Sequence, residues 1–325
     1  MHYFRLKPAA RAICASALIF LAARPVGAAI QPYAPDIATL HLWSLDEATT
    51  PCVDAAPGGT NLTYMIGGAT LGSASFSSSV VNFTNCISFG TLSTPAAVIF
   101  PSGSGNVGTA SPFTFAGSDG AFTFEALVQI GFNPTNFFRS QPCQILNCDA
   151  DGTGTRVFQF RLLPVGYPGG GGDTNVVRIE FINGTTTAAV VPIPTNGPDA
   201  IVSNSWYHIA VTYNGAANTT SNLLFYWTLL ATNRTAASCI YGTNLVSDLP
   251  GVSSATTIFS VGNSARNPGG GSGPAAANFP GNIDEVASAA WRAARTNLFS
   301  KTFPCRPAAI SRARRIILPT RSTAI

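Results

Sequence analysis

Two pairs of adjacent acids are the residues whose types could support acid–base chemistry: Asp46-Glu47 and Asp284-Glu285. Glycoside hydrolysis needs two carboxyl groups that flank the scissile bond. Neighbouring side chains on a β-strand point to opposite faces of the sheet, so an adjacent pair cannot form this dyad by itself. We therefore expect one acid of each pair to accept hydrogen bonds from backbone or hydroxyl groups and the other to be solvated. A metal site is the alternative.

Nucleophilic catalysis has less support. The sequence contains no G-x-S-x-G nucleophile elbow, and the histidines beyond residue 2 are His41 and His208. Each is flanked by apolar residues of a predicted strand, so we expect both to be strand residues rather than general bases. In WYHIAVTY (206–213) the alternation places His208 with Trp206 on an outer face, opposite a more apolar set that faces the core: Tyr207, Ile209, Val211 and Tyr213.

The best metal-ligand pattern is CDADGTG (148–154). Asp149 and Asp151 bracket one residue, and the glycines that follow allow a sharp turn. Calcium takes several oxygen ligands, which such a loop supplies from carboxylates and backbone carbonyls. The next alternate position is Thr153 rather than a third acid. The pattern therefore favours a polar hairpin turn, with calcium held by Asp149 and Asp151 as the alternative.

The N-terminal segment 1–28 has the pattern of a secretory signal peptide: basic residues, a short apolar run and small residues before the cleavage point. No later stretch approaches eighteen apolar residues, so we expect no transmembrane segment. The protein is therefore predicted to be secreted and extracellular, or held in a periplasm or at a cell surface. In such compartments cysteines form disulfides. We expect this of the six that follow the signal: Cys52, Cys86, Cys143, Cys148, Cys239 and Cys305.

The positive charge of the chain lies at its two ends. The formal net charge is +4, but without the four basic residues of 1–28 and the five arginines of 306–325 the remainder has 9 basic and 14 acidic residues, a net charge of −5. A nucleic-acid partner is therefore not expected. We expect the tail 306–325 to be disordered. Association with an anionic envelope polymer is the alternative role for it.

The body, 29–305, is predicted to be one all-β domain. Short runs rich in Val, Ile, Phe, Tyr and Thr alternate with turn residues, and several show the period-2 pattern of half-buried strands. Glycine runs such as YPGGGGD (167–173) are interpreted as flexible loops, because no strand–glycine–helix unit follows them. This organisation indicates a β-sandwich of two antiparallel sheets.

Four motifs then occur in a characteristic order: LHLWSLDE, FTFEALVQI, WYHIAVTYNG followed by LLFYW, and FPGNIDEV. Together they resemble secreted bacterial laminin-G-like members of the concanavalin A-like lectin/glucanase superfamily, over residues 38 to 300. The resemblance implies a jelly roll whose first and last strands pair, with 40–46 beside 282–288. It also implies binding of glycans or other surface ligands, sometimes with calcium. Glucanases of this superfamily carry E-x-D-x-E on one strand, which this sequence lacks.

Glycan binding requires an exposed aromatic platform beside polar groups. Most aromatic residues lie in predicted strands and are expected in the core, whereas Tyr167 lies in a Pro-Gly loop and is the better exposed candidate. We therefore expect a secreted binding module for carbohydrate or cell-surface ligands that is not an enzyme. The alternatives are a structural or protein-adhesion module of the bacterial envelope without a sugar site and, less favoured, a divergent glycoside hydrolase.

Overall fold

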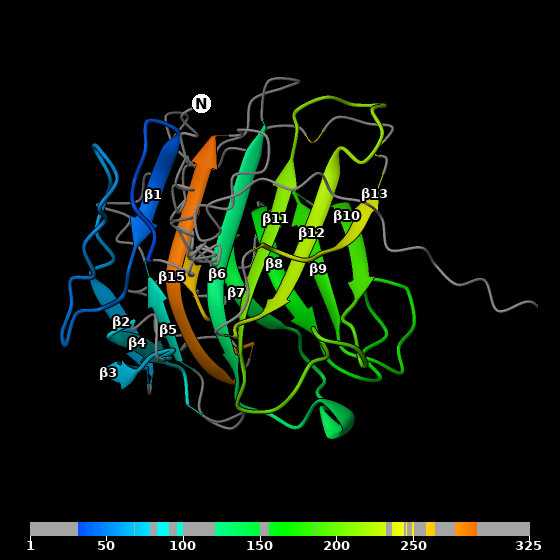
Figure 1. Cartoon of the computed structure of the whole chain (residues 1–325), viewed down its shortest axis with the longest axis horizontal. Helices are drawn as coiled ribbons and strands as arrows, with labels where there is room; N and C mark the ends of the chain where they lie inside the picture. Colours follow the sequence, from blue (N-terminus) through cyan, green and yellow to red (C-terminus); the bar gives the residue numbers. More distant parts are fainter. Residues whose placement is uncertain are drawn as a thin grey trace, which may run out of the picture.

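The computed structural model describes residues 32–67, 69–78, 83–90, 96–99, 121–149, 156–184, 186–231, 236–243, 245, 249, 258–263 and 277–290. In these ranges the chain folds almost entirely into β-strands, arranged as two antiparallel sheets (Figure 1). The predicted all-β sandwich is therefore confirmed. The predicted signal segment and basic tail lie outside the described residues. Within the described ranges, no helix has the length and apolar character needed to cross a membrane.

The first sheet is eight-stranded, in the order β13-β12-β11-β6-β15-β4-β3, with β1 added against β15. Every pairing in it is antiparallel. Its strands are β1 (Thr39–Trp43), β3 (Thr70–Ala74), β4 (Asn85–Ser88), β6 (Phe122–Ile130), β11 (Trp206–Tyr213), β12 (Leu223–Leu229), β13 (Cys239–Thr243) and β15 (Gly281–Ala290).

The second sheet is seven-stranded, in the order β10-β9-β8-β7-β14-β5-β2, and it too is antiparallel. A single 3-10 turn, η3 (Pro134–Asn136), precedes β7 among the described residues. The strands of this sheet are β2 (Tyr64–Gly67), β5 (Ala96–Ile99), β7 (Cys143–Asp149), β8 (Arg156–Leu163), β9 (Arg178–Asn183), β10 (Thr186–Pro192) and β14 (Ile258–Val261).

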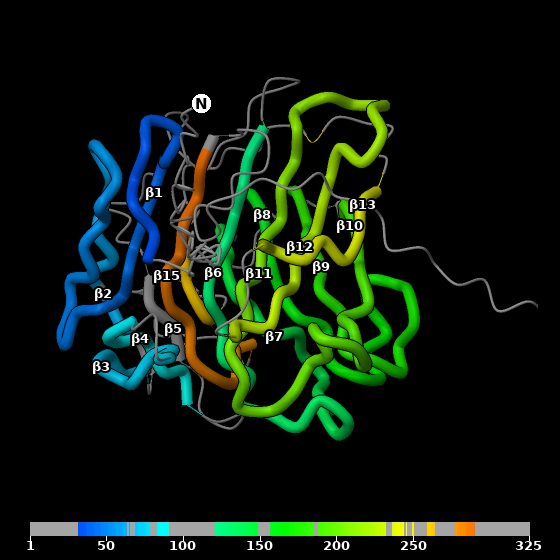
Figure 2. Tube along the Cα trace, in the orientation of Figure 1, coloured from blue at the N-terminus to red at the C-terminus, as the bar shows by residue number. Residues whose placement is uncertain are grey.

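The first and last described strands lie side by side, as the resemblance implied (Figure 2). Trp43 of β1 pairs with Val286 of β15, and His41 pairs with Ser288. The last described strand, β15, extends to Ala290.

Aromatic rings join the two sheets. Trp43 of β1 stacks on Phe259 of β14 with the ring centroids 5.2 Å apart, and Phe124 of β6 stacks on Phe158 of β8 at 4.3 Å. All four side chains are at most 1% exposed. The period-2 alternation of each strand puts these residues on the inner face and leaves the residues between them for the outer face. The core therefore lies between the two sheets and consists of the inner-face residues that the alternation predicted.

The glycine-rich loop after β8 has fixed contacts, contrary to its interpretation as a flexible segment. The buried guanidinium of Arg178 donates from Nη2 to the carbonyl of Tyr167 at 2.6 Å, and from Nη1 to the carbonyls of Gly169 and Gly171. Gly170 has φ of 79°, and a Cβ there would lie 2.6 Å from Leu163. The positive φ and this close approach favour glycine at position 170.

The predicted disulfide framework is wrong for four cysteines. Cys52, Cys86, Cys143 and Cys148 are buried and not bonded to another sulfur. Cys143 and Cys148 lie in one strand, about 17 Å apart at 3.3 Å per residue, far beyond the reach of a disulfide. Burial raises the pKa of Cys52 to about 12, which keeps that thiol protonated. Cys239 takes part in a disulfide, and Cys305 lies outside the described residues.

We expect Arg178→Leu to lower the free energy of unfolding by about 3 kcal/mol, because three loop carbonyls lose a charged donor. Arg178→Lys keeps the charge without the planar fork and should fall between Arg178→Leu and the wild type. Denaturant unfolding measures both variants. Unfolding of Arg178→Leu at the wild-type midpoint would show that the loop does not depend on this side chain.

Candidate functional site

The acid pair of the last strand lies at a β-bulge. Asp284 of β15 pairs with Leu127 of β6, and Ala287 of β15 pairs with Glu125 of β6. Two residues separate these positions on β15 but only one separates them on β6, so β15 contains one extra residue. Glu285 takes up the irregularity with φ of 48°. Asp284 and Glu285 are only 0% and 2% exposed. The prediction that one of the two acids is solvated is therefore wrong for this pair.

Each carboxyl group of the bulge has hydrogen-bond donors. Asp284 accepts from the hydroxyl of Ser75 and, at 2.9 Å, from the backbone N–H of Glu285. Glu285 accepts from the backbone N–H of Tyr33 at 3.0 Å. The bulge therefore ties the N-terminal segment and the residue after β3 to the last strand. The other acid pair binds backbone donors nearer the surface, since Asp46 accepts from the N–H of Asn85 at 3.1 Å.

Glu125 and His208 form a buried pair beside this bulge. The Nε2 atom of His208 lies 3.1 Å from Oε2 of Glu125, and the side chains are 0% and 3% exposed. Glu125 alternates with the core residues Phe124 and Ala126, so the pair lies on the outer face of the first sheet, as predicted for His208. The local pattern around Glu125 did not indicate this pair, because the partner lies on another strand, 83 residues away.

We use the name carboxyl cluster for Glu125, His208, Asp284, Glu285 and Tyr33. Burial raises the pKa of Asp284 to about 8. Burial and, secondly, the charge of Asp284 raise the pKa of Glu285 to about 9. Burial also raises the pKa of Tyr33, and the charges of Glu125 and Glu285 add to this effect. Asp284 and Glu285 therefore hold protons at neutral pH.

The carboxyl cluster can donate and accept protons, and in this conformation it is buried. Its five members are at most 8% exposed, and the two acids of the bulge are hydrogen-bonded to backbone and hydroxyl donors. These contacts hold the bulge and the segment at Tyr33 together.

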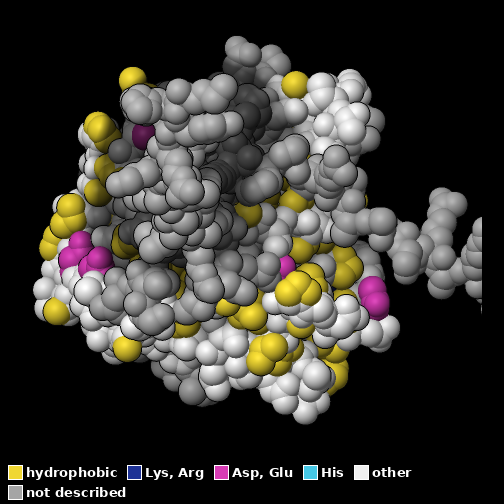
Figure 3. Space-filling model, viewed as in Figure 1, with side chains coloured by type: hydrophobic (Ala, Val, Ile, Leu, Met, Phe, Trp, Pro, Cys, Tyr) yellow, Lys and Arg dark blue, Asp and Glu magenta, His cyan; other side chains and the backbone are white. Residues whose placement is uncertain are grey.

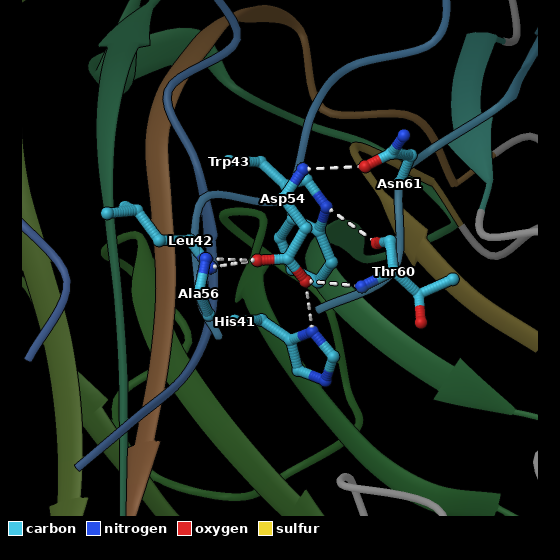
Figure 4. A network of polar contacts seen from close by, with 7 residues as sticks. All are labelled: His41, Leu42, Trp43, Asp54, Ala56, Thr60 and Asn61. Atoms are coloured by element: carbon cyan, nitrogen blue, oxygen red, sulfur yellow. Dashed lines mark hydrogen bonds and ion pairs between the residues drawn. The ribbon is translucent and has the colours of Figure 1, made fainter. Parts of the chain in front are cut away.

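A second polar network surrounds Asp54 (Figure 4). Its Oδ2 atom lies 2.5 Å from Nδ1 of His41 and accepts the N–H of Thr60 at 2.8 Å. Its Oδ1 atom accepts the N–H groups of Leu42 at 2.9 Å and Ala56 at 3.0 Å. The carboxylate thus closes the loop after β1 back onto that strand. His41 also stacks on Trp43, with ring centroids 4.9 Å apart, which fits its prediction as a strand residue.

The metal prediction stays a prediction. Asp149 is the last residue of β7, where its backbone pairs with Arg156 and Ile258, and Asp151 lies outside the described residues. Among the residues that the structure describes, no group of three or more His, Cys, Asp or Glu side chains is placed to hold a metal ion.

The outer face of the second sheet is polar but buried. Gln144 and Asn147 of β7 lie opposite Arg161 and Gln159 of β8. Arg161 donates from Nε to Glu180 of β9 at 2.6 Å and from Nη1 to Gln159 at 2.8 Å. Asn147 and Glu180 are 0% exposed. This face was not recognised in the sequence, because its members are spread over three strands.

An open, shallow pocket of about 320 Å³ lies where η3 meets the end of β8. Its described lining residues are Phe138, Arg139, Ser140, Val165 and Gly166. The side chain of Phe138 is 64% exposed, while its backbone forms a parallel bridge with Val165. A Cβ at Gly166 would lie 3.5 Å from the ring of Phe138, in ordinary contact. The pocket therefore combines an exposed aromatic ring with a guanidinium and a hydroxyl.

The backbone around this pocket is held by internal contacts. Phe137, the neighbour of the exposed ring, is 1% exposed and stacks on Phe132 with ring centroids 3.7 Å apart. Asn133 caps η3 by accepting the N–H of Thr135 at 3.1 Å. Tyr167, the aromatic residue that the sequence favoured as exposed, is half-buried and lies against Gly169. The exposed platform is therefore Phe138.

No family model and no curated protein sequence matches this chain. Among solved structures, similarity is found to Trypanosoma rangeli sialidase in complex with sialic acid (14% identity, 81% of this chain and 32% of that one, TM-score 0.43). A heptameric SAP-like pentraxin from Limulus polyphemus is also similar (12% identity, 52% of this chain and 63% of that one, TM-score 0.30). So is the enzymatically active domain of bacteriophage CBA120 tailspike protein 2 (14% identity, 63% of this chain and 25% of that one, TM-score 0.38). The chain spans about a third of the sialidase length.

These comparisons correct one expectation. Sialidases are glycosidases, so the structures similar to this chain include enzymes. The sequence-based prediction that the protein is not an enzyme is therefore wrong. At this low similarity no activity is transferred to the chain. Membership of the laminin-G-like group also stays a prediction, since no family model supports it.

The carboxyl cluster makes stability depend on pH. The pKa values of Asp284 and Glu285 rise from 3.8 and 4.5 to about 8 and 9 on folding, so the folded state binds more protons between these limits. Stability should therefore fall as pH rises from 5 to 9, by up to about 1.4 kcal/mol per pH unit for each group. Asp284→Asn, which does not titrate, should flatten the profile of the melting temperature. An unchanged slope in this variant would contradict the assignment.

We expect Asp54→Asn to lower the free energy of unfolding by about 2–4 kcal/mol, because an amide N–H would face a backbone N–H or the imidazole of His41. Asp173→Asn is the matched control, since Asp173 is exposed and its side chain bonds Asn175 in its own loop. Denaturant unfolding compares the two variants. Equal stability of both would mean that the Asp54 network does not hold the loop.

Proposed function

We propose that the protein binds carbohydrate at the pocket of Phe138, Arg139, Ser140, Val165 and Gly166. The observation that carries the proposal is the ring of Phe138, 64% exposed beside a guanidinium and a hydroxyl. The C–H face of a sugar packs on an aromatic ring, and its hydroxyls need hydrogen-bonding groups at the edge of that ring. This pocket supplies both on one open surface.

The rigid surroundings of Phe138 support the proposal. Its backbone is bridged to Val165, and its neighbour Phe137 is anchored in the core. A platform that is already in place loses little conformational entropy when a ligand binds. Gly166 has no side chain, and a Cβ there would already contact the ring of Phe138 at 3.5 Å.

The proposal includes an exported location, where a sugar-binding surface would meet glycans of a cell surface or matrix. It also keeps calcium as a candidate partner. A glycan array probed with the full-length protein, with added calcium and with chelator, tests both points. The absence of binding under both conditions would favour a structural or adhesion role instead.

Phe138→Ala should weaken glycan binding at least about tenfold, since the stacking surface is lost. Phe138→Tyr keeps the ring and should keep most of the affinity. Tyr241→Ala is the matched control, because Tyr241 is an exposed aromatic residue (40%) on β13. Titration calorimetry with a glycan selected on the array measures all three variants. Equal affinity of Phe138→Ala and the wild type would overturn the assignment of the pocket.

A further inference from the structure

We propose that the segment 32–38 is a releasable strap, which leaves the outer face of the first sheet when the acids of the bulge beneath it lose their protons. The proposal concerns a different part of the molecule from the sugar pocket and does not depend on the proposed function. Tyr33 is only 8% exposed, whereas Ile37 in the same segment is 89% exposed. The residues on either side of Tyr33 are exposed as well. A single buried ring therefore anchors a segment whose other side chains are exposed or half-buried.

The anchor is held by apolar side chains and by one carboxyl group. Tyr33 belongs to a cluster of buried apolar side chains that also contains Leu127 of β6 and Trp206 of β11. Its backbone N–H donates to Oε2 of Glu285 at 3.0 Å. Its hydroxyl is buried and has no hydrogen-bond partner among the described residues. Because a buried hydroxyl without a partner costs free energy that water would return, release of the ring recovers part of what it loses.

The carboxyl group that binds the strap lies among other acids. Glu285 follows Asp284 on the bulge, and the charges of Asp46 and Glu125 also act on it. Glu125 has His208 as its ion-pair partner at 3.1 Å. On the face of the molecule shown in Figure 3, acidic side chains are visible and, among the described residues seen there, no Lys or Arg. A negative charge on Glu285 would therefore add to the charges of its acidic neighbours.

The direction of the effect follows from the competition at Glu285. The hydrogen bond from Tyr33 favours the ionised carboxylate, but burial and the charge of Asp284 outweigh it and raise the pKa of Glu285 to about 9. Asp284, with a pKa of about 8, loses its proton first and adds repulsion. When the strap leaves, the carboxylate of Glu285 gains access to water, so ionisation favours the released form. The ratio of released to attached strap should therefore rise with pH, by up to about tenfold per pH unit for each proton lost.

The competing interpretation is a loss of stability of the whole sandwich, in which the strap and the strands open together. The two interpretations differ in a measurable quantity, which is the protection of the Tyr33 amide hydrogen relative to that of the amides in β11. The strand β11 pairs with β6 on one side and β12 on the other, so its amides report on opening of the sheet itself.

Hydrogen exchange of the full-length protein at pH 6 and pH 9, read by mass spectrometry with labelling times scaled to the intrinsic exchange rate, tests the proposal. We expect the protection of the Tyr33 amide to fall at least about tenfold at pH 9, while the protection of β11 stays the same. Equal protection of the Tyr33 amide at both pH values would overturn the inference. An equal loss of protection in Tyr33 and β11 would support the competing interpretation and also overturn it.

Three variants isolate the contact. Glu285→Gln keeps an acceptor for the Tyr33 N–H but does not titrate, so it should show nearly the same protection at both pH values. Asp173→Asn, which changes an exposed acid outside the carboxyl cluster, is the matched control and should respond as the wild type does. Tyr33→Ala removes the anchor and should give the fast exchange at position 33 already at pH 6.

Two results of the variants would contradict the strap. One is a full pH response in Glu285→Gln, and the other is wild-type protection at position 33 in Tyr33→Ala. If Glu285→Gln does not fold, the comparison of Tyr33 with β11 in the wild-type protein decides, because only a releasable strap loses protection while the sheet keeps it.

Discussion

The last strand carries the constraint on which the rest of the first sheet depends. β15 pairs with β1, β4 and β6, so three segments from distant parts of the chain meet on it. Its bulge at Asp284 and Glu285 would leave two carboxyl groups in a buried layer without solvent. Burial raises both pKa values, so both acids stay protonated at neutral pH. Asp284 also accepts a hydrogen bond from Ser75, and Glu285 accepts one from the backbone of Tyr33. The bulge thereby fixes the segments at the edge of the sheet.

Arginines play a comparable part at the second sheet. Arg178 gathers the carbonyls of the glycine-rich loop, Arg161 pairs with Glu180, and Arg139 reaches Asn278. Charged residues make up only 10% of the sequence, and each of these guanidinium groups bonds to a polar group of another segment. Around the pocket, the charge-assisted hydrogen bond of Arg139 to Asn278 acts together with the core contact of Phe137 and Phe132.

The proposed sugar pocket follows from this arrangement. Phe138 is exposed, whereas its neighbour Phe137 is buried and stacks on Phe132. The carboxyl cluster, with stronger acid–base character, is closed in the described conformation. The described lining of the pocket includes an exposed aromatic ring and a hydroxyl, whereas the groups with raised pKa values are buried and hydrogen-bonded within the fold.

The sequence by itself determined the sandwich, the inner face of WYHIAVTY and the meeting of the first and last strands, because period-2 alternation is local and the motifs occur in order. It missed six strands, among them β3, whose residues TLGSA carry little hydrophobic signal. The others are β2, β4, β7, β10 and β13. Only the tertiary structure could decide the rest. The bulge that buries Asp284 with Glu285, the pairing of Glu125 with His208, and the exposure of Phe138 in place of Tyr167 all depend on contacts between strands far apart in the chain. The residue pattern of one strand does not show which side chains lie beside it on the neighbouring strands. Those neighbours determine how deeply a side chain is buried and how far its pKa shifts.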